Sequence, residues 1–353
     1  MAGKKASGTG VCLTLALLLL FVLIACVGIG SVAIPVADIL KIMAAPPVRA
    51  LGRVLARPAW QNFGGDIPGT WAVIVLRLRL PRTIAAMLVG ASLSLAGSTM
   101  QGLFKNPLAD PYILGVSSGA AVGAAAAMLT GLAWNALGAF AIPLAAFAGG
   151  IGSLVLVYSL AGSGGRSTAG MLLAGVAVST FLGAILSLLI FFSGQQLQQV
   201  VFWMMGGFSG RNWLHVAGIL PFLLAGGSVM LWHARELDAL AVGEEQAYYL
   251  GVDVERVKGR LLWAAALVTA AAVSICGLIG FVGLVVPHAV RLIGGPVHRR
   301  LLPAAALAGA VFLALADLLA RVLLAPLELP VGMITALVGG PFFLYLLRRR
   351  RVA

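Results

Sequence analysis

Two ionisable residues inside one apolar run are the clearest candidates for chemistry within a hydrophobic segment. Asp317 and Arg321 are four residues apart, so a helix places them on one face, where they can form an ion pair. Charges within apolar spans are functional candidates, yet this pair stands toward one end of its run, where a structural ion pair costs little. The apolar runs contain no series of Asp, Glu and His residues such as a proton or sodium pathway needs.

The chain lacks the residue patterns required for bond-making or metal chemistry. No G-x-x-x-x-G-K-[ST] sequence occurs, so the chain has no P-loop for ATP. The cysteines Cys12, Cys26 and Cys276 lie within apolar runs without metal-ligand spacing. The four histidines stand at run ends or in loops. We therefore expect no catalytic residue, no metal site and no cofactor in this chain, and no enzymatic activity.

The composition indicates that lipid is the natural solvent of this chain. Of 353 residues, 61% are hydrophobic and 10% are charged, and the mean hydropathy is +1.05, whereas soluble domains carry about 25% charged residues. Backbone polar groups in lipid must be paired within helices or closed barrels. Because the apolar runs are too long for barrel strands and do not alternate, we predict an all-α, polytopic integral membrane protein.

About ten hydrophobic segments are candidates for spanning helices, each of which needs roughly 20 apolar residues. The eighth segment is short and fits a partial or tilted helix. No soluble domain interrupts the series, so residues 1–353 are expected to form a single transmembrane domain. The predicted spans are 11–30, 82–104, 112–131, 137–160, 170–192, 213–232, 259–279, 281–294, 301–324 and 331–347.

The distribution of Lys and Arg predicts the orientation, because these residues concentrate in cytoplasmic segments. Lys4 and Lys5 precede the first span, and the run 348–351 follows the last one. With an even number of spans, both termini are expected in the cytoplasm, the 31–80 segment outside and the 233–258 segment inside. The net charge of +13 is spread over such short segments and indicates topology rather than nucleic-acid binding. A cleaved signal is the alternative to an uncleaved first helix, which we expect.

The external 31–80 segment is basic, against the usual bias. Its basic residues between Lys41 and Arg57 are expected to contact lipid headgroups, although an acidic docking partner would also balance them. Arg79 and Arg82 flank Pro81, where a helix would begin. That position would put two guanidinium groups beside the positive end of a helix dipole and favours a functional role for them.

Two spans carry small residues at every fourth position, a pattern that lets helix backbones approach closely in lipid. Close packing is expected for the first stripe. The second stripe contains serines, so it fits either close packing or the lining of a polar pathway. The stripes are Gly115, Gly119, Gly123 and Ala127 in one span and Gly175, Ser179, Gly183 and Ser187 in the other.

The cytoplasmic segment 233–258 is polar and amphipathic. Gly243 and Gly251 bracket a predicted helix of about seven residues, with Glu244 and Glu245 in its first turn, as the helix dipole prefers. A helix this short is not stable alone. It is therefore expected to pack against something, either as a surface helix on the membrane or as a docking element for a partner protein.

A series of motifs, in order along nearly the whole chain, resembles the iron-chelate and cobalamin permease family of type II ABC importers. No single motif is decisive, but their joint occurrence is specific. They are Arg79-Leu80-Pro81-Arg82-Thr83, Asn106-Pro107-Leu108-Ala109-Asp110-Pro111, Leu114-Gly115-Val116-Ser117-Ser118-Gly119, Trp203-Met204-Met205-Gly206-Gly207, Gly280-Phe281-Val282-Gly283-Leu284 and Glu328-Leu329-Pro330-Val331-Gly332.

The resemblance implies a permease of ten spans in the bacterial inner membrane. Such a permease forms a homodimer, binds two cytoplasmic ATPase subunits that hold ATP and Mg, and receives substrate from a periplasmic or lipid-anchored binding protein. It implies three groups of site residues. These are the binding-protein docking residues Arg79, Arg82 and Arg321, the cytoplasmic gate residues Asn106, Leu108, Ser167 and Thr168, and the coupling-helix residues Gly243, Glu244, Glu245, Leu250 and Gly251.

The expected function is import of a bulky metal chelate by alternating access, and the substrate remains open among ferric siderophore, cobalamin and haem. The alternative is an ion-coupled secondary transporter, which would need ionisable residues at the membrane midplane. Four glutamines between Gln195 and Gln199 precede Trp203. They either face a chelate entering the pathway or cap an interfacial helix.

Overall fold

The computed structural model describes residues 8–30, 32–65, 67–131, 138–161 and 168–350. Every regular element in these ranges is helical, which pairs the backbone polar groups within each segment. The elements are α1 (Gly8–Gly28), α2 (Val36–Val54), α3 (Pro58–Gln61), α4 (Gly69–Val73), the π-helical η1 (Ile74–Arg79), α5 (Leu80–Leu103), η2 (Pro111–Leu114), α6 (Val116–Leu129), η4 (Gly138–Phe140), α7 (Ala141–Leu160), α8 (Thr168–Phe191), η5 (Gly194–Gln196), α9 (Leu197–Met205), α10 (Trp213–Trp232), α11 (Ala234–Val242), α12 (Glu244–Tyr249), α13 (Val254–Cys276), α14 (Val282–Gly294), α15 (His298–Val322) and α16 (Val331–Arg350).

Within the described residues, each predicted span coincides with a helix. Six of these helices (α1, α7, α8, α10, α13 and α15) are long and apolar enough to cross a membrane. The apolar helical stretches of α6, α14 and α16 are shorter. The remaining predicted span is α5. The third predicted span, 112–131, divides into η2 and α6, because Gly115 adopts a left-handed backbone with φ of 78° between them.

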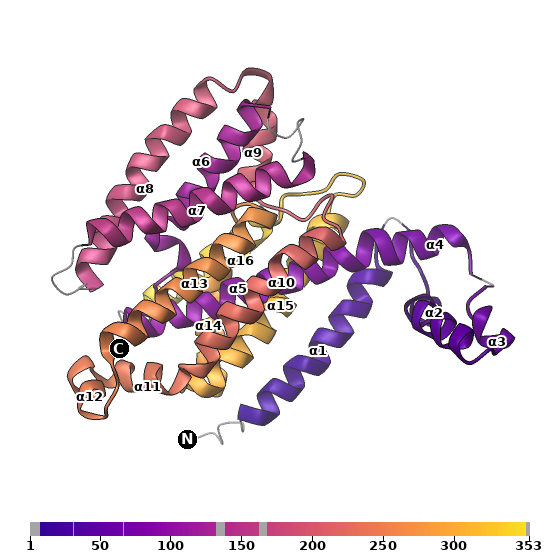
Figure 1. Cartoon of the computed structure of the whole chain (residues 1–353), viewed down its shortest axis with the longest axis horizontal. Coiled ribbons are helices and arrows are strands. Elements are labelled where there is room, and N and C mark those ends of the chain that lie inside the picture. Colours follow the sequence, from indigo (N-terminus) through magenta and orange to yellow (C-terminus); the bar gives the residue numbers. More distant parts are fainter. Residues whose placement is uncertain (1–7, 31, 66, 132–137, 162–167, 351–353) are drawn as a thin grey trace.

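The centre of the bundle is built from α5, α13 and α15 (Figure 1). Nearly all of α5 is buried, although its sequence is only moderately apolar. A close crossing holds α5 against α15, since a Cβ on Gly90 would overlap the carbonyl group of Gly309. Small residues at this crossing let the two backbones touch, which is how helices associate in lipid without a hydrophobic driving force.

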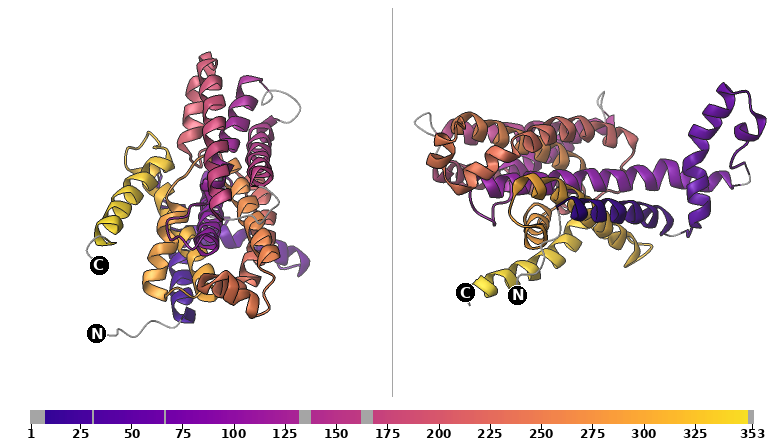
Figure 2. Two further views of the ribbon diagram at one scale, coloured as in Figure 1. Left: turned by 90° about the vertical axis from the view of Figure 1, so that its left-hand side faces the viewer. Right: turned by 90° about the horizontal axis from the view of Figure 1, so that it is seen from below.

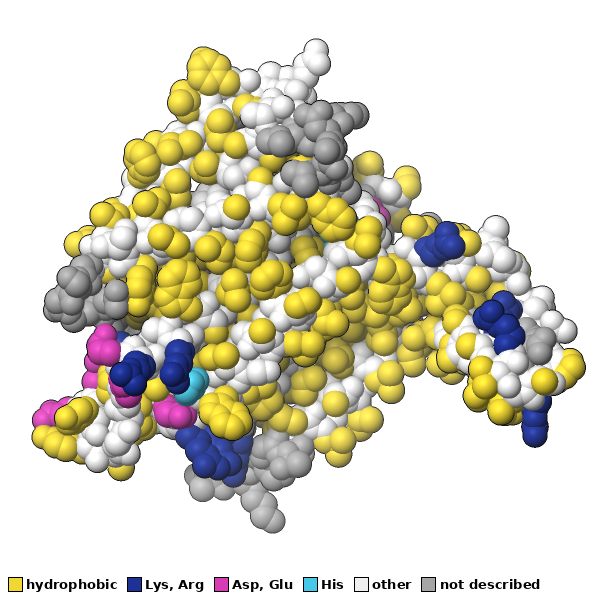
Figure 3. Space-filling view, viewed as in Figure 1, with side chains coloured by type: hydrophobic (Ala, Val, Ile, Leu, Met, Phe, Trp, Pro, Cys, Tyr) yellow, Lys and Arg dark blue, Asp and Glu magenta, His cyan; other side chains and the backbone are white. Residues whose placement is uncertain are grey.

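The peripheral helices present apolar side chains outward. In the most apolar stretch of each helix, only 17% of the residues of α1 and 22% of those of α8 are buried inside the protein, whereas 78% of those of α13 are buried. Hydrophobic side chains cover the body of the molecule (Figure 3), while charged side chains gather near α11 and α12 and on the projecting segment that runs from α2 to η1. The exposed apolar faces of α1 and α8 therefore lie against lipid or another protein chain.

The 31–80 segment, which reads as a polar stretch in the sequence, is largely helical in its described residues. Helices α2, α3 and α4 project from the bundle at one end (Figures 1 and 2). From Gly69 the chain continues through α4 and η1 into α5 without a break. As expected, α5 begins at Leu80 with Pro81 in its first turn, but helical backbone already starts at Gly69, so Pro81 does not stand at a free helix N-terminus. The wide π-helical turn of η1 precedes this proline and relieves the contact that a proline makes with the preceding α-helical turn.

The other end of the bundle carries α11 and α12 (Figure 1). The first residues of α1 and the last residues of α16 lie at this same end in both views (Figures 1 and 2). The chain ends and the predicted docking segment thus share one side of the molecule, and α2 to α4 lie on the other.

Candidate functional site

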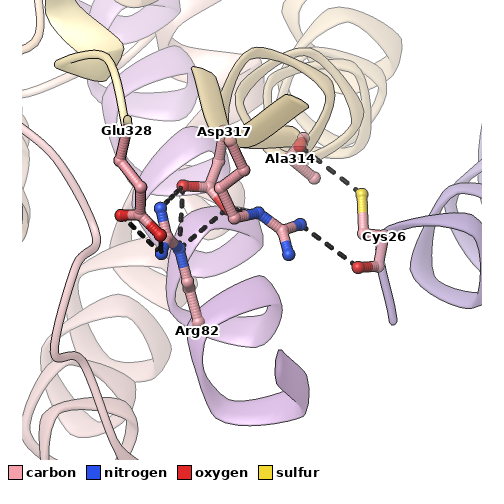
Figure 4. A network of polar contacts seen from close by, with 6 residues as sticks. Cys26, Arg82, Ala314, Asp317 and Glu328 are labelled. Atoms are coloured by element: carbon pink, nitrogen blue, oxygen red, sulfur yellow. Dashed lines mark hydrogen bonds and ion pairs between the residues drawn. The ribbon is translucent and has the colours of Figure 1, made fainter. Parts of the chain in front are cut away.

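A network of charged side chains joins α5, α15 and the chain after α15 (Figure 4). Arg82 Nη2 lies 2.9 Å from Asp317 Oδ1, and Arg82 Nη1 lies 2.8 Å from Glu328 Oε1. The Asp317 side chain is 1% exposed and that of Glu328 is 42% exposed. Burial opposes ionisation of Glu328, but hydrogen bonds from Arg82 outweigh it and lower the pKa of this carboxyl group.

Arg321 completes the network from the side of α1. Its Nε lies 3.2 Å from Asp317 Oδ2, which confirms the predicted ion pair across one turn of helix. Its Nη2 donates to the carbonyl oxygen of Cys26 at 3.1 Å, and the Cys26 thiol contacts the carbonyl oxygen of Ala314 at 3.5 Å (Figure 4). One buried carboxylate therefore holds two guanidinium groups and links α1, α5 and α15.

Arg79 is buried, and its guanidinium group binds the carbonyl groups at the C-terminal end of α1. Its Nη1 donates to the carbonyl oxygens of Val27 and Gly28 at 2.9 and 3.1 Å, and its Nη2 donates to that of Val32 at 2.6 Å. The last carbonyl groups of a helix have no partner within the helix and attract a cation. Gly30 leaves the space that this guanidinium occupies, because a Cβ there would lie 2.6 Å from Arg79 Nη2.

The three predicted docking residues thus share one end of the molecule, and each has partners within the chain. The Arg82 side chain is 12% exposed, and the Arg79 and Arg321 side chains are buried. Docking to a binding protein stays a prediction for them. Beyond the predicted pair of Arg321 with Asp317, the fold gives Arg79 and Arg82 a structural use that sequence reasoning missed, because their partners at the end of α1 and at Asp317 and Glu328 are far away along the chain.

The predicted coupling segment folds as two short helices. Gly243, with extended backbone, separates α11 from α12, and Gly251, with φ of 82°, follows α12. The bracketed helix and the two glutamates in its first turn are confirmed. Lys258 Nζ lies 3.0 Å from Glu244 Oε1, so an ion pair fastens the start of α12 to α13. The buried Ala247 side chain anchors the opposite face.

The outer face of α12 and the residue after it is aromatic and apolar. Tyr248, Tyr249 and Leu250 are 70%, 77% and 74% exposed. Aromatic residues standing out from a polar segment are the usual anchors of protein–protein contacts.

A histidine–aspartate contact that sequence reasoning missed ties α11 to the start of α15. His298 Nδ1 lies 2.7 Å from Asp238 Oδ1, and the backbone N–H of His298 donates to the same oxygen at 2.6 Å. A carboxylate at a helix N-terminus is favoured by the helix dipole. The contact therefore fastens α11 to the start of α15, the helix that carries Asp317 toward its other end. Sixty residues separate the partners, so no local pattern identified them.

The predicted gate residues occupy the turn after α5 and the start of α8. Asn106 Oδ1 accepts a hydrogen bond from the backbone N–H of Leu108 at 2.9 Å, which closes a tight turn. Thr168 is the first residue of α8, and Ser167 lies outside the described residues. Asp110, in the same connection, accepts from the Tyr112 N–H at 2.8 Å, and burial raises its pKa to about 6.

The two small-residue stripes differ in their surroundings. A Cβ on Gly119 or Gly123 would overlap backbone of α7, so the first stripe packs closely as expected. In the second stripe, a Cβ on Gly175 would overlap the Ile113 carbonyl group, whereas Gly183 has open space around it. Ser179 is half-buried beside Gly115, and Ser187 is exposed. The α8 stripe therefore packs at one end and is open at the other.

A cavity of about 420 Å³, hereafter the α9 cavity, lies where α9 and the chain after it meet the start of α16. Its lining includes Arg82 and Glu328 of the charged network, and also Trp203 and Arg211. Of the predicted glutamine cluster, Gln199 lines it. Sequence reasoning did not single out Arg211.

The described residues contain no group of three or more His, Cys, Asp or Glu side chains placed to hold a metal ion. The arrangement is that of a helical assembly with an internally braced charged network at one end and the exposed aromatic face of α12 at the other.

Comparison with known proteins gives consistent results. The FecCD transport family matches residues 17–349. The chain is 50% identical over 299 residues to the cobalamin import system permease protein BtuC of Halobacterium salinarum, covering 84% of this chain and 79% of that one. It is 46% identical over 302 residues to the hemin transport system permease protein HmuU of Yersinia pestis, covering 84% and 88%.

The fold agrees with a solved inward-facing ABC transporter of the metal-chelate type. The TM-score is 0.81 with 30% sequence identity, over 97% of this chain and 99% of that one. An uncharacterized ABC transporter permease protein of Bacillus subtilis, YvrB, is 45% identical over 312 residues, covering 86% and 87%. The chain belongs to the FecCD transport family and is an ABC transporter permease.

Proposed function

We propose that this chain is the membrane permease of an importer for a bulky metal chelate, working as a homodimer with two cytoplasmic ATPase subunits and an external binding protein. ATP and Mg are held by the ATPases. The α12 end, with both chain termini, faces the cytoplasm of a bacterial cell, and α2 to α4 face outward. Alternating access follows from movement of α12 under ATP-driven closure of the ATPases.

The observation that carries this proposal is the construction of α12. A helix of six residues is too short to be stable alone, yet it is fastened to α13 by the ion pair between Glu244 and Lys258. Its exposed face presents Tyr248 and Tyr249. A rigidly held, aromatic projection fits a cleft on a partner, and the Asp238–His298 contact supplies a route from this segment to α15.

The three arginines at the other end support docking of an acidic binding protein in a specific way. Arg82 already binds one half-exposed carboxylate, that of Glu328. A glutamate from a binding protein would exchange with Glu328 rather than meet a free cation. This exchange makes docking reversible, because the ion pair between Arg82 and Glu328 forms again when the binding protein leaves.

The proposed substrates are cobalamin, haem or a ferric siderophore, since the named relatives carry cobalamin and hemin. The gate is assigned to Asn106, Leu108, Ser167 and Thr168, and the open end of the α8 stripe, with Gly183 and Ser187, is assigned to the pathway. A secondary transporter would need an ionisable group free to exchange a cation. Asp317 is instead held by two guanidinium groups.

The test is assembly with the partner ATPase after co-expression, followed by ATP hydrolysis in nanodiscs. Replacing Tyr248 and Tyr249 together by Ala should weaken ATPase association about tenfold or more, because exposed aromatic anchors dominate such contacts. The matched control is another exposed aromatic pair, Phe191 and Phe192 at the C-terminal end of α8, with both residues replaced by Ala. It should leave association unchanged.

Failure of wild-type protein to associate with the ATPase would contradict the importer proposal. Association that both double variants weaken equally would contradict the assignment of α12 as the coupling element.

A further inference from the structure

Arg211 carries a positive charge that no acidic residue neutralises among the described residues. None of the ion pairs between those residues includes Arg211, and its one polar side-chain contact is a 3.5 Å approach of Nη1 to His215 Nε2. Its Nε is buried without a hydrogen-bond partner. Burial lowers the pKa of this guanidinium, as expected for a cation removed from water without a counter-charge. An anion beside Arg211 would remove this cost.

A second buried donor lines the same cavity. The indole Nε1–H of Trp203 is buried and has no acceptor within the described part of the chain. Buried donors are almost always paired in folded proteins, so two unpaired donors on residues that line one cavity call for a ligand with acceptor atoms. The contrast with Arg82 is informative, because Arg82 lines the cavity too but is fully engaged by Asp317 and Glu328.

The remaining wall of the α9 cavity selects among anions. Met128, Phe202 and Phe208 supply apolar surface. The volume of about 420 Å³ falls within the roughly 300–1,000 Å³ typical of small-molecule sites. A fully hydrated inorganic anion gains nothing from such walls, whereas an organic carboxylate can place its charge at the donors and its apolar body against the aromatic rings.

We propose that the α9 cavity binds an organic carboxylate, presented by an acidic arm of the imported chelate, with Arg211 and Trp203 as its donors. The choice of a chelate as the source rests on the proposed import function.

The first experiment uses fluorine NMR of 4-fluorobenzoate and its neutral counterpart 4-fluorobenzamide with the full chain in nanodiscs, after subtraction of empty nanodiscs. Fluorobenzoate should bind and fluorobenzamide should not. Arg211→Gln should weaken fluorobenzoate binding about tenfold or more, and Trp203→Phe, which keeps an aromatic ring but removes the N–H, should weaken it about threefold. Arg53→Gln, at an exposed arginine of α2, is the matched control and should bind as wild type does.

The second experiment identifies the source of the carboxylate by competition. Zinc protoporphyrin, which carries two carboxylate arms, should displace fluorobenzoate, and its dimethyl ester should not. Displacement by neither compound would refute the chelate as the source and leave a site for a free organic acid.

Equal binding of 4-fluorobenzoate and 4-fluorobenzamide would overturn the carboxylate site. Unchanged binding of 4-fluorobenzoate to both the Arg211→Gln and the Trp203→Phe variants would overturn it too. Arg211→Gln protein that does not fold leaves Trp203→Phe and the amide comparison to decide. Carboxylate-selective binding by protein that never associates with the ATPase would support the carboxylate site and contradict the proposed import function. ATPase association without carboxylate-selective binding would contradict only the carboxylate site.

Discussion

The buried carboxylate of Asp317 should be the most important single charge for the stability of this protein. Asp317→Asn keeps the shape of the side chain but removes its negative charge. It also replaces one of the two carboxylate oxygens, which lie 2.9 Å from Arg82 Nη2 and 3.2 Å from Arg321 Nε, by an NH2 group that cannot accept a hydrogen bond. Removing one partner of a buried ion pair costs about 3–5 kcal/mol. In this variant Arg82 still forms an ion pair with Glu328. Arg321 has lost its ion pair with Asp317, so it is the more strongly affected of the two arginines.

The matched variant is Glu328→Gln, which removes the other carboxylate bound to Arg82. Because the Glu328 side chain is 42% exposed, its ion pair is screened and should contribute about 1 kcal/mol or less. Thermal unfolding in nanodiscs, followed by size-exclusion chromatography of the soluble fraction, measures both. We expect Asp317→Asn to lower the apparent Tm by about 5–15 °C and Glu328→Gln to lower it by a few degrees at most.

Equal Tm changes in the two variants would refute the reasoning, because burial would then not decide the strength of these pairs. A double variant, Arg82→Gln with Asp317→Asn, tests it further. It should lose less stability than the sum of the single variants, since each single variant leaves a charge unpaired.

Three further predictions concern the helix packing, the connection after α5 and the contact between α11 and α15. Gly119→Val should prevent stable folding because its Cβ would overlap the Gly149 carbonyl group, whereas Gly152→Ala, which has open space, should fold normally, as yields of monodisperse protein will show. Asp110→Asn should stabilise the protein by up to about 3 kcal/mol at pH 7.5 and have no effect near pH 4. The reason is that the raised folded pKa of about 6 makes wild-type stability fall as pH rises from about 4 to 6; melting curves across this range decide. Asp238→Asn should leave ATPase association intact but reduce the stimulation of ATP hydrolysis by substrate-loaded binding protein, measured in nanodiscs, because α11 then grips the start of α15 less firmly.

The helical spans and the short helix α12 were predictable because their signals are local. Runs of apolar residues mark α1, α7, α8, α10, α13 and α15 wherever they pack. Gly251, with φ of 82°, ends α12 through a backbone preference that depends on few neighbours. The start of α5 near Pro81 was predicted too, but the π-helical turn of η1 before it was not, because such a turn has no recognisable sequence signal.

The sequence by itself determined that this chain is helical, that its helices are apolar enough to span a membrane, and that a short helix lies between Gly243 and Gly251, since composition, periodicity and glycine placement act over a few residues. The tertiary structure alone decided which charges meet. It brought Asp317 to Arg82, Asp238 to His298 and the end of α1 to Arg79. It left Arg211 without an acid beside the α9 cavity. The physical reason is that electrostatic and hydrogen-bond energies depend on distances in space, and packing sets these between residues tens to hundreds of positions apart in the chain.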